Sequence, residues 1–398
     1  MYAERQYVET QISALEQIMF TEQYADKVIE RVLSEQPYWD LLKRKSFVTD
    51  TYNIIRWWRK LTVALNGDDN KSVLVWSIWG AYQLLSTSKV PDWPEFKSLD
   101  IDKLNNNLAQ ASIAQVNSYP DWLWQKASEE LGEQWPLIAQ GLNVPAKTYL
   151  RANTLKCSLS DLKTSLAQEK IECEHLPSSE ALEVTQYGHL FKSQAFSQGW
   201  FEMQDAGSQQ IAQLLEPKAG QRVVDACAGA GGKSLHIAAL MQNKGYVLAM
   251  DIHQHKLDTL KKRAKRAGVH MLETREIKNS KTIKRLKDKF DRVLLDVPCS
   301  GTGVLRRNPD AKWLLKSENI NALVSLQAEI LQRYSQMCKP GGRLVYATCS
   351  ILPSENQQQV QTFLANNTQF KLVEELHLQP GINSDFDGFY GAALERQG

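Results

Sequence analysis

Two cysteines lie where the sequence predicts the ends of two β-strands. Cys299 follows the strand-like run 291–296, and Cys349 follows the strand-like run 342–348. An ionised thiol is a nucleophile that can form a covalent intermediate with a substrate. Asp296 ends the first run, and in doubly wound sheets ligands bind at the carboxyl ends of the strands. We therefore interpret Cys299, Cys349 and Asp296 as candidate catalytic residues.

The cysteine pattern also limits where the protein works. There are six cysteines and no Cys-x-x-Cys pair, which argues against a zinc site and a disulfide framework and fits a reducing cytoplasm. We interpret Cys157, Cys173 and Cys338 as core residues. The first ten residues lack the apolar core of a signal peptide, and no apolar run has the length of a bilayer span. A cytoplasmic location, with neither metal nor membrane, is the expectation.

A glycine-rich turn at 227–234 separates a strand-like run from a helical one. Such a turn presents backbone N–H groups and a helix N-terminus to a ligand. A P-loop requires glycine where Cys227 stands, and the dinucleotide fingerprint requires glycine where Ser234 stands. The third possibility is the S-adenosylmethionine loop of class I methyltransferases, in which Asp225 precedes the glycines and Asp251 accepts hydrogen bonds from the ribose. A turn that merely joins strand to helix would also explain the glycines alone.

The order of elements predicts the fold around these residues. Strands and helices alternate from residue 205, which is typical of a doubly wound, mostly parallel α/β sheet. We predict three domains: a helical bundle at 1–104, a helical linker with a small α+β module at 105–204, and the α/β domain at 205–398. The runs are 222–227, 246–252, 291–296 and 342–348 for strands, 24–33, 48–65, 233–241, 254–267 and 319–337 for helices, and 67–70 for a loop.

The net charge of +2 conceals an uneven distribution. Residues 205–350 contain 25 Lys and Arg against 13 Asp and Glu, so the remainder contains 22 against 32. A chain polarised in this way can bind a polyanion through one face while staying soluble. Much of the basic cluster at 256–292 is interpreted as the solvated face of a helix.

Several motifs in the same order give the chain a resemblance to a known family. Together they cover residues 115–398 and resemble the Sun/Fmu (RsmB) family of RNA cytosine-C5 methyltransferases, whose bacterial ribosomal members carry a NusB-like helical RNA-binding domain. The motifs are LRANTLK at 150–156, QDAGSQ at 204–209, DACAGAGGK at 225–233, DVPCSGTG at 296–303, RRNPDAKW at 306–313, YATCS at 346–350 followed by Glu355 and Asn356, and DGFY at 387–390.

The resemblance implies roles for the candidate catalytic residues. Cytosine C5 is a poor nucleophile until a thiolate adds to C6. Cys349 is implied to make that bond, and Cys299 to assist removal of the C5 proton and enzyme release. Asp296 is implied to hydrogen-bond the cytosine edge, and Lys233 to help keep the thiol ionised.

The resemblance further implies S-adenosylmethionine as cofactor. In this chain Gly229 and Ala230 stand where relatives usually have Ala and Pro. After the acids that correspond to Asp225 and Asp251, relatives have a third acidic residue, which contacts the adenine amino group. Here Glu276 or Asn279 stands in for that third acid. The implied cofactor-binding residues are Asp225, Cys227, Ala228, Gly229, Ala230, Gly231, Gly232, Lys233, Asp251, Ile252, Glu276, Asn279 and Asp296.

The expected substrate is an unstacked cytosine in RNA, because the target base must enter the pocket. Small-subunit ribosomal RNA is preferred on the resemblance of the helical domain. Transfer RNA, and a non-catalytic RNA-binding assembly factor on the same fold, remain alternatives, and a monomer is expected. The candidate RNA contacts are Arg306, Arg307, Lys312, Arg151 and Asn153.

Overall fold

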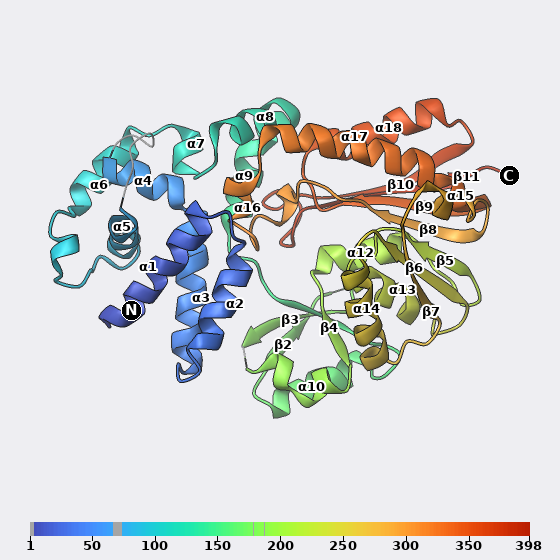
Figure 1. Ribbon diagram of the computed structural model, residues 1–398, viewed down its shortest axis with the longest axis horizontal. Helices are drawn as coiled ribbons and strands as arrows, with labels where there is room; N and C mark the ends of the chain where they lie inside the picture. The colour runs from blue at the N-terminus through green and yellow to red at the C-terminus, as the bar shows by residue number, and fades with distance from the viewer. Residues whose placement is uncertain (1–3, 67–73, 178, 187) are drawn as a thin grey trace. The chain divides into compact units, whose positions relative to one another are not determined.

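The computed structural model describes residues 4–66, 74–177, 179–186 and 188–398 (Figure 1). These residues form two compact units, one made of 1–145 with 305–317 and the other of 146–304 with 318–398. The boundaries therefore differ from the three domains predicted from sequence, because the helical part continues to residue 145 and takes in a segment from far along the chain. The loop predicted at 67–70 lies outside the described residues.

The first unit is helical in its described part, as predicted for its first 104 residues. The single helix predicted at 48–65 is interrupted at Trp57, and Asp40 caps the first of the two observed helices by accepting a hydrogen bond from the Lys43 backbone N–H (2.7 Å). Trp39 and Trp79 lie in the core of this unit. The helices are α1 (Arg5–Phe20), α2 (Ala25–Glu35), α3 (Leu41–Arg56), α4 (Trp58–Asn66), α5 (Val75–Thr87), α6 (Ile101–Ala109), α7 (Ile113–Val116), α8 (Asp121–Leu131), α9 (Trp135–Asn143) and α16 (Ala311–Leu314), with 3-10 turns at Pro94–Phe96 and Gly132–Gln134.

The segment 305–317 belongs to the helical unit although the chain on both sides of it belongs to the second unit. The Asp310 carboxylate accepts a hydrogen bond from the Ala25 backbone N–H at the start of α2 (3.0 Å). The Trp313 indole N–H donates to the carbonyl of Ile55 near the end of α3 (2.9 Å). Polar contacts thus fix this segment to two helices of the N-terminal part.

The second unit begins with the small α+β module, which has a four-stranded antiparallel sheet in the order β2-β3-β1-β4. A capping box at Ser158 and Asp161 starts its helix. The elements are β1 (Tyr149–Ala152), α10 (Leu159–Gln168), β2 (Glu172–His175), β3 (Ala181–Gln186), α11 (Gln194–Ser197) and β4 (Phe201–Met203), with a 3-10 turn at Leu190–Lys192.

A seven-stranded sheet in the order β10-β11-β9-β8-β5-β6-β7 forms the rest of the unit. The five neighbouring strands β9, β8, β5, β6 and β7 are parallel, which confirms the predicted doubly wound arrangement. An antiparallel C-terminal pair, not predicted from sequence, extends it. The strands are β5 (Arg222–Asp225), β6 (Tyr246–Asp251), β7 (Leu272–Glu276), β8 (Phe290–Asp296), β9 (Cys338–Thr348), β10 (Phe370–Leu378) and β11 (Phe389–Arg396).

Helices cover both faces of this sheet (Figure 1). Successive strand residues point to opposite faces, so Leu294 packs with α12 and α13, whereas Val293 and Leu295 pack with α15, α17 and α18. Strands β5, β6, β8 and β9 end at the same edge, where the candidate residues follow. The helices are α12 (Ala206–Leu214), α13 (Gly232–Leu240), α14 (Gln254–Ala267), α15 (Ser280–Lys284), α17 (Ser317–Tyr334) and α18 (Gln357–Asn366), with 3-10 turns at Thr302–Val304, Ser335–Met337 and Pro353–Glu355.

Candidate active site and cofactor pocket

The glycine-rich turn joins the end of β5 to the start of α13. Gly231 has a φ of 88°, and a Cβ at this position would lie 1.9 Å from the Cδ1 atom of Leu260 on α14. Only glycine fits here, because both the backbone conformation and the space exclude a side chain. The turn therefore packs closely against α14 while its outer side faces the edge where the parallel strands end.

Asp225 and Asp251 flank this turn, as predicted. The Asp225 carboxylate is buried and accepts a hydrogen bond from the Ser234 hydroxyl (2.6 Å), while its other oxygen has no partner in the described residues. Burial raises the pKa of Asp225 to about 7, opposed by the Ser234 hydrogen bond. Asp251 accepts hydrogen bonds from the backbone N–H groups of Gly229 (2.9 Å) and His253 (2.8 Å).

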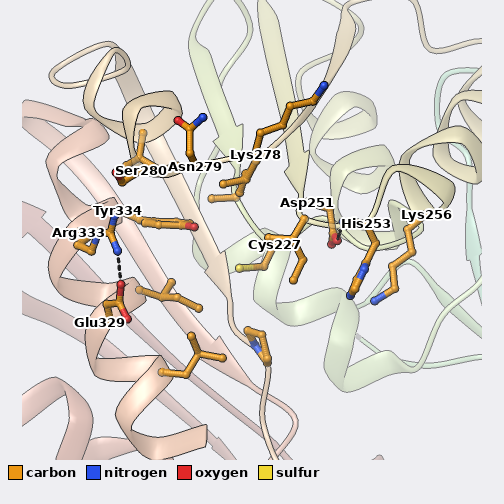
Figure 2. A pocket seen from close by; sticks show the side chains of 17 residues that line it. Cys227, Asp251, His253, Lys256, Lys278, Asn279, Ser280, Glu329, Arg333 and Tyr334 are labelled. Carbon is orange, nitrogen blue, oxygen red and sulfur yellow. Dashed lines mark hydrogen bonds and ion pairs between the residues drawn. The ribbon is translucent and has the colours of Figure 1, made fainter.

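A cavity of about 480 Å³ opens beside Asp251 (Figure 2). The predicted residues Cys227, Asp251, Ile252 and Asn279 line it, with His253 and Lys256 next to Asp251. In Figure 2 the opposite wall comes from α17, where Glu329 and Arg333 form an ion pair and the Tyr334 ring points into the cavity. The sequence identified this helix but not its role, because nothing in its apolar period shows which residues face a ligand.

The structure distinguishes between Glu276 and Asn279, the two residues that could replace the third acid. Glu276 pairs with Lys278 (3.5 Å) and is not among the residues that line the cavity. Asn279 lines the cavity, although its side-chain oxygen accepts a hydrogen bond from the Lys281 backbone N–H (3.0 Å) and so caps α15. Of the two, Asn279 is the one placed to reach a ligand in this cavity.

The two candidate cysteines meet at the ends of β8 and β9. The Cys299 and Cys349 sulfur atoms lie 3.4 Å apart, and both side chains are partly exposed. The hydrogen bond with Cys349 and burial raise the pKa of Cys299 well above its usual range. At this distance one thiol can donate a hydrogen bond to the other sulfur.

Lys233 and Asp296 complete the group. The Lys233 ammonium donates to the Asp296 carboxylate at 2.7 Å. Burial acts to lower the pKa of Lys233, but Asp296, with further help from Cys349, raises it above the usual value. A protonated lysine therefore lies within electrostatic range of Cys349. The structure brings all four predicted catalytic residues into one region.

Gly303 shows how closely the loops around the cysteines pack. Its backbone N–H donates to the Cys349 carbonyl (2.9 Å), and its own carbonyl accepts from the Gly388 N–H (2.8 Å). A Cβ at Gly303 would lie 2.2 Å from the Gly388 carbonyl oxygen, so glycine is required. The motifs at 296–303, 346–350 and 387–390 thus meet at one point.

Two predicted RNA contacts in the small module have structural partners instead. Arg151 is buried and donates to the carbonyl of Gly232 at the start of α13 (2.7 Å). Asn153 is buried and donates to the carbonyls of Gly199 and Ala267 (2.8 Å each). Their polar atoms fix the module to the glycine turn and to the end of α14. The prediction that they contact RNA is therefore not supported.

The basic residues after the Cys299 loop are also enclosed. Lys312 is 1% exposed, and its ammonium donates to the carbonyls of Arg56 and Ser118 and to the side-chain oxygen of Asn143. Arg306 is buried and donates to a backbone carbonyl of α9 (3.0 Å). Neither side chain is available to a phosphate in this structure, which corrects the prediction. Arg307 is partly exposed, and its role stays a prediction.

Comparison with known proteins shows the family to which this chain belongs. Residues 212–393 match the family described as 16S rRNA methyltransferase RsmB/F, and residues 119–190 match the ferredoxin-like domain of RsmF/B-like methyltransferases. The ribosomal RNA small subunit methyltransferase B of Vibrio cholerae serotype O1 is 36% identical over 300 residues, which cover 73% of this chain and 68% of that protein. The chain belongs to the RsmB/F methyltransferase family. The resemblance found in the sequence is confirmed.

Solved structures agree with this assignment. The crystal structure of PH0851 superposes with a TM-score of 0.80 at 24% identity and covers 97% of this chain and 98% of that one, which shows a common fold. A methyltransferase homolog from Pyrococcus horikoshii superposes with a TM-score of 0.63 at 27% identity and covers 72% and 97% of the two chains. This RsmB/F protein is an S-adenosylmethionine-dependent RNA methyltransferase.

The residues present fit that cofactor. The unpartnered Asp225 oxygen is a buried acceptor beside the turn, and the Asp251 carboxylate lies on the wall of the cavity. In the part of the chain that the structure describes, no group of three or more His, Cys, Asp or Glu residues is arranged to hold a metal ion. Among the described helices, none combines the length and the apolar character needed to cross a membrane.

Proposed function

We propose that this enzyme methylates C5 of a cytosine in RNA through a covalent bond between Cys349 and cytosine C6. The observation that carries the proposal is the placement of two thiols 3.4 Å apart next to the ion pair of Lys233 and Asp296. A methyltransferase that acts on a nucleophilic nitrogen or oxygen needs no thiol pair. The relative named above, a ribosomal RNA small subunit methyltransferase, supports ribosomal RNA as the substrate.

The proposed mechanism assigns a step to each residue. Bound S-adenosylmethionine supplies an electrophilic methyl group. The Cys349 thiolate would add to C6 and push an electron pair to C5, which could then accept the methyl group that the bound cofactor would supply. Asp296, held by Lys233, hydrogen-bonds the cytosine edge and fixes the ring for this attack.

Release of the product requires Cys299. Once Cys349 is bonded to C6, it no longer shares a proton with Cys299, which removes the largest cause of the high pKa of Cys299. Cys299 then loses its proton to solvent and takes the proton from C5. The electron pair left at C5 re-forms the ring double bond, and the Cys349–C6 bond breaks. The cycle ends with Cys299 protonated and Cys349 as thiolate.

Bisulfite sequencing tests the function directly. RNA from cells with and without the active chain is treated with bisulfite, which converts cytosine but not 5-methylcytosine. We expect one or a few cytosines in small-subunit ribosomal RNA to be protected only when the active chain is present. Protection in transfer RNA alone would replace the substrate proposal. Methyl transfer to RNA without any protected cytosine would overturn the assignment of C5.

We expect cofactor binding to depend on the ionisation of Asp225. The cofactor is cationic, so it binds the ionised carboxylate better than the neutral acid. Because the pKa of Asp225 is raised to about 7, affinity should increase by up to about tenfold in total as the pH rises from 6 to 8, with release of a proton. Isothermal titration in buffers of different ionisation enthalpy measures both quantities. Asp225→Asn should abolish the dependence, and an unchanged pH profile in that variant would contradict the expectation.

A further inference from the structure

Glu355 is a wholly buried carboxylate that the mechanism above does not use. It is 0% exposed, and among the described residues it forms no ion pair. One carboxylate oxygen accepts from the Ser300 backbone N–H (2.8 Å) and the Gln327 side-chain amide (2.9 Å). The other accepts from the hydroxyls of Ser300 and Ser350. Four hydrogen-bond donors therefore surround this carboxylate.

The positions of these donors connect Glu355 to the thiol pair. Ser300 follows Cys299 in the chain, and Ser350 follows Cys349. A single carboxylate therefore holds both cysteine loops, one at the end of β8 and the other at the end of β9. The Thr302 hydroxyl lies between the two serine hydroxyls, 3.1 Å from that of Ser300 and 3.0 Å from that of Ser350, and closes the network.

The charged groups that act on the two thiols also differ. The negative charge of Glu355 acts on Cys299 in addition to the hydrogen bond with Cys349 and to burial. The positive charge of Lys233 interacts with Cys349. Cys299 also interacts electrostatically with the buried hydroxyl of Tyr346, which donates to the Glu355 backbone carbonyl (2.6 Å). A proton shared by the two sulfurs is therefore more stable on Cys299.

We propose that Glu355 is a positioning residue of the methyl transfer, which sets the distance between the two cysteine loops and keeps their shared proton on Cys299, so that Cys349 is the thiolate. The proposal rests on the proposed function of the pair. It gives a physical reason for two thiols of the same chemical type to have different roles at 3.4 Å. Without the carboxylate, either sulfur would hold the proton and the loops would lose their common anchor.

The test compares Glu355→Gln, Glu355→Asp and the control Glu395→Gln, which changes an exposed glutamate on β11. Glutamine has one acceptor oxygen in place of two, so its amide group faces one of the two pairs of donors, and it has no charge. We expect Glu355→Gln to lower kcat by about 10²-fold or more, with the KM for S-adenosylmethionine changed less than about threefold. Glu355→Asp keeps the charge and should recover part of kcat, while Glu395→Gln behaves as the unmodified enzyme.

Labelling with iodoacetamide, read by peptide mass spectrometry, follows the thiols without RNA or cofactor. In the unmodified protein Cys349 should react faster than Cys299 at neutral pH, and Glu355→Gln should reduce this preference at least about threefold, whereas Glu355→Asp retains it. An unchanged labelling preference in folded Glu355→Gln would overturn the proposal, even if activity fell. If Glu355→Gln does not fold, Ser350→Ala, which removes one donor, must lower kcat for the proposal to stand. Because labelling needs no methyl transfer, its outcome is independent of whether C5 of cytosine is the target.

Discussion

Cys349→Ala is expected to lower methyl transfer to RNA by more than about 10³-fold, because C5 of cytosine does not attack the methyl group unless a thiolate has added to C6. The variant should keep its fold and its affinity for S-adenosylmethionine, since the Cys349 side chain is partly exposed and is not among the residues that line the cavity. Transfer of radiolabelled methyl groups to RNA, together with cofactor titration, measures the two properties separately.

Cys299→Ala should block the last step of the cycle, in which the methylated RNA is released from the enzyme. The Cys349 adduct and the methylated ring can form, but the C5 proton has no nearby base, so the enzyme remains bonded to RNA. We expect a complex that survives denaturing electrophoresis, forms only with cofactor, and disappears in the Cys299→Ala, Cys349→Ala double variant. Cys157→Ala, which removes a partly buried thiol of the small module, is the matched control and should behave as the unmodified enzyme.

Together, the Cys349→Ala and Cys299→Ala variants distinguish the roles of the two cysteines. If Cys299→Ala lost activity without a covalent complex and Cys349→Ala accumulated one, the roles of the two cysteines would be reversed. If either alanine variant retained full activity, that cysteine would be neither nucleophile nor base. A non-catalytic RNA-binding factor would show no methyl transfer even with both cysteines present, which contradicts the assignment of the chain as an enzyme.

The alternation of strands and helices and the active-site edge could be predicted from the sequence because their signals are local. Helix α14 was predicted with its observed bounds, since its apolar period is regular and Gly268 ends it in a left-handed conformation. The strands before Asp225 and Asp296 are apolar runs that parallel sheets require. Once these strands are parallel, their ends must meet at one edge, which places the candidate residues together without knowledge of any contact.

The rest of the site depends on contacts between distant parts of the chain. The wall formed by α17 and the four donors of Glu355 come from residues that the sequence gives no reason to pair. Charge is also ambiguous in a sequence. Lys312 is predicted to contact RNA because it is close in sequence to the active site, and Arg151 because it lies in a motif of the family, yet both donate hydrogen bonds to carbonyl groups of the protein. Only the burial of each side chain distinguishes the two roles.

Lys312→Met is expected to lower the free energy of unfolding by about 3 kcal/mol. The Lys312 ammonium has no carboxylate partner among its three hydrogen bonds, and burial lowers its pKa well below the usual value, so a charge is being held in the interior at some cost. Methionine removes that cost but leaves three buried oxygen atoms without a donor, each worth about 1–3 kcal/mol. The loss should exceed the gain, because the Tyr119 ring, 4.4 Å from the ammonium, also stabilises the cation.

The matched control is Lys316→Met, since Lys316 lies on the same segment 305–317 and its side chain is 68% exposed. Its stability should change by less than about 0.5 kcal/mol. Chemical denaturation followed by tryptophan fluorescence measures the difference, because Trp313 on this segment donates to the α3 backbone and the helical unit contains most of the tryptophans. If Lys312→Met were as stable as Lys316→Met, the buried ammonium would not be what holds the segment to the helical unit. A loss of about 3 kcal/mol would instead show that the lysine in the RRNPDAKW motif acts within the fold and not on RNA.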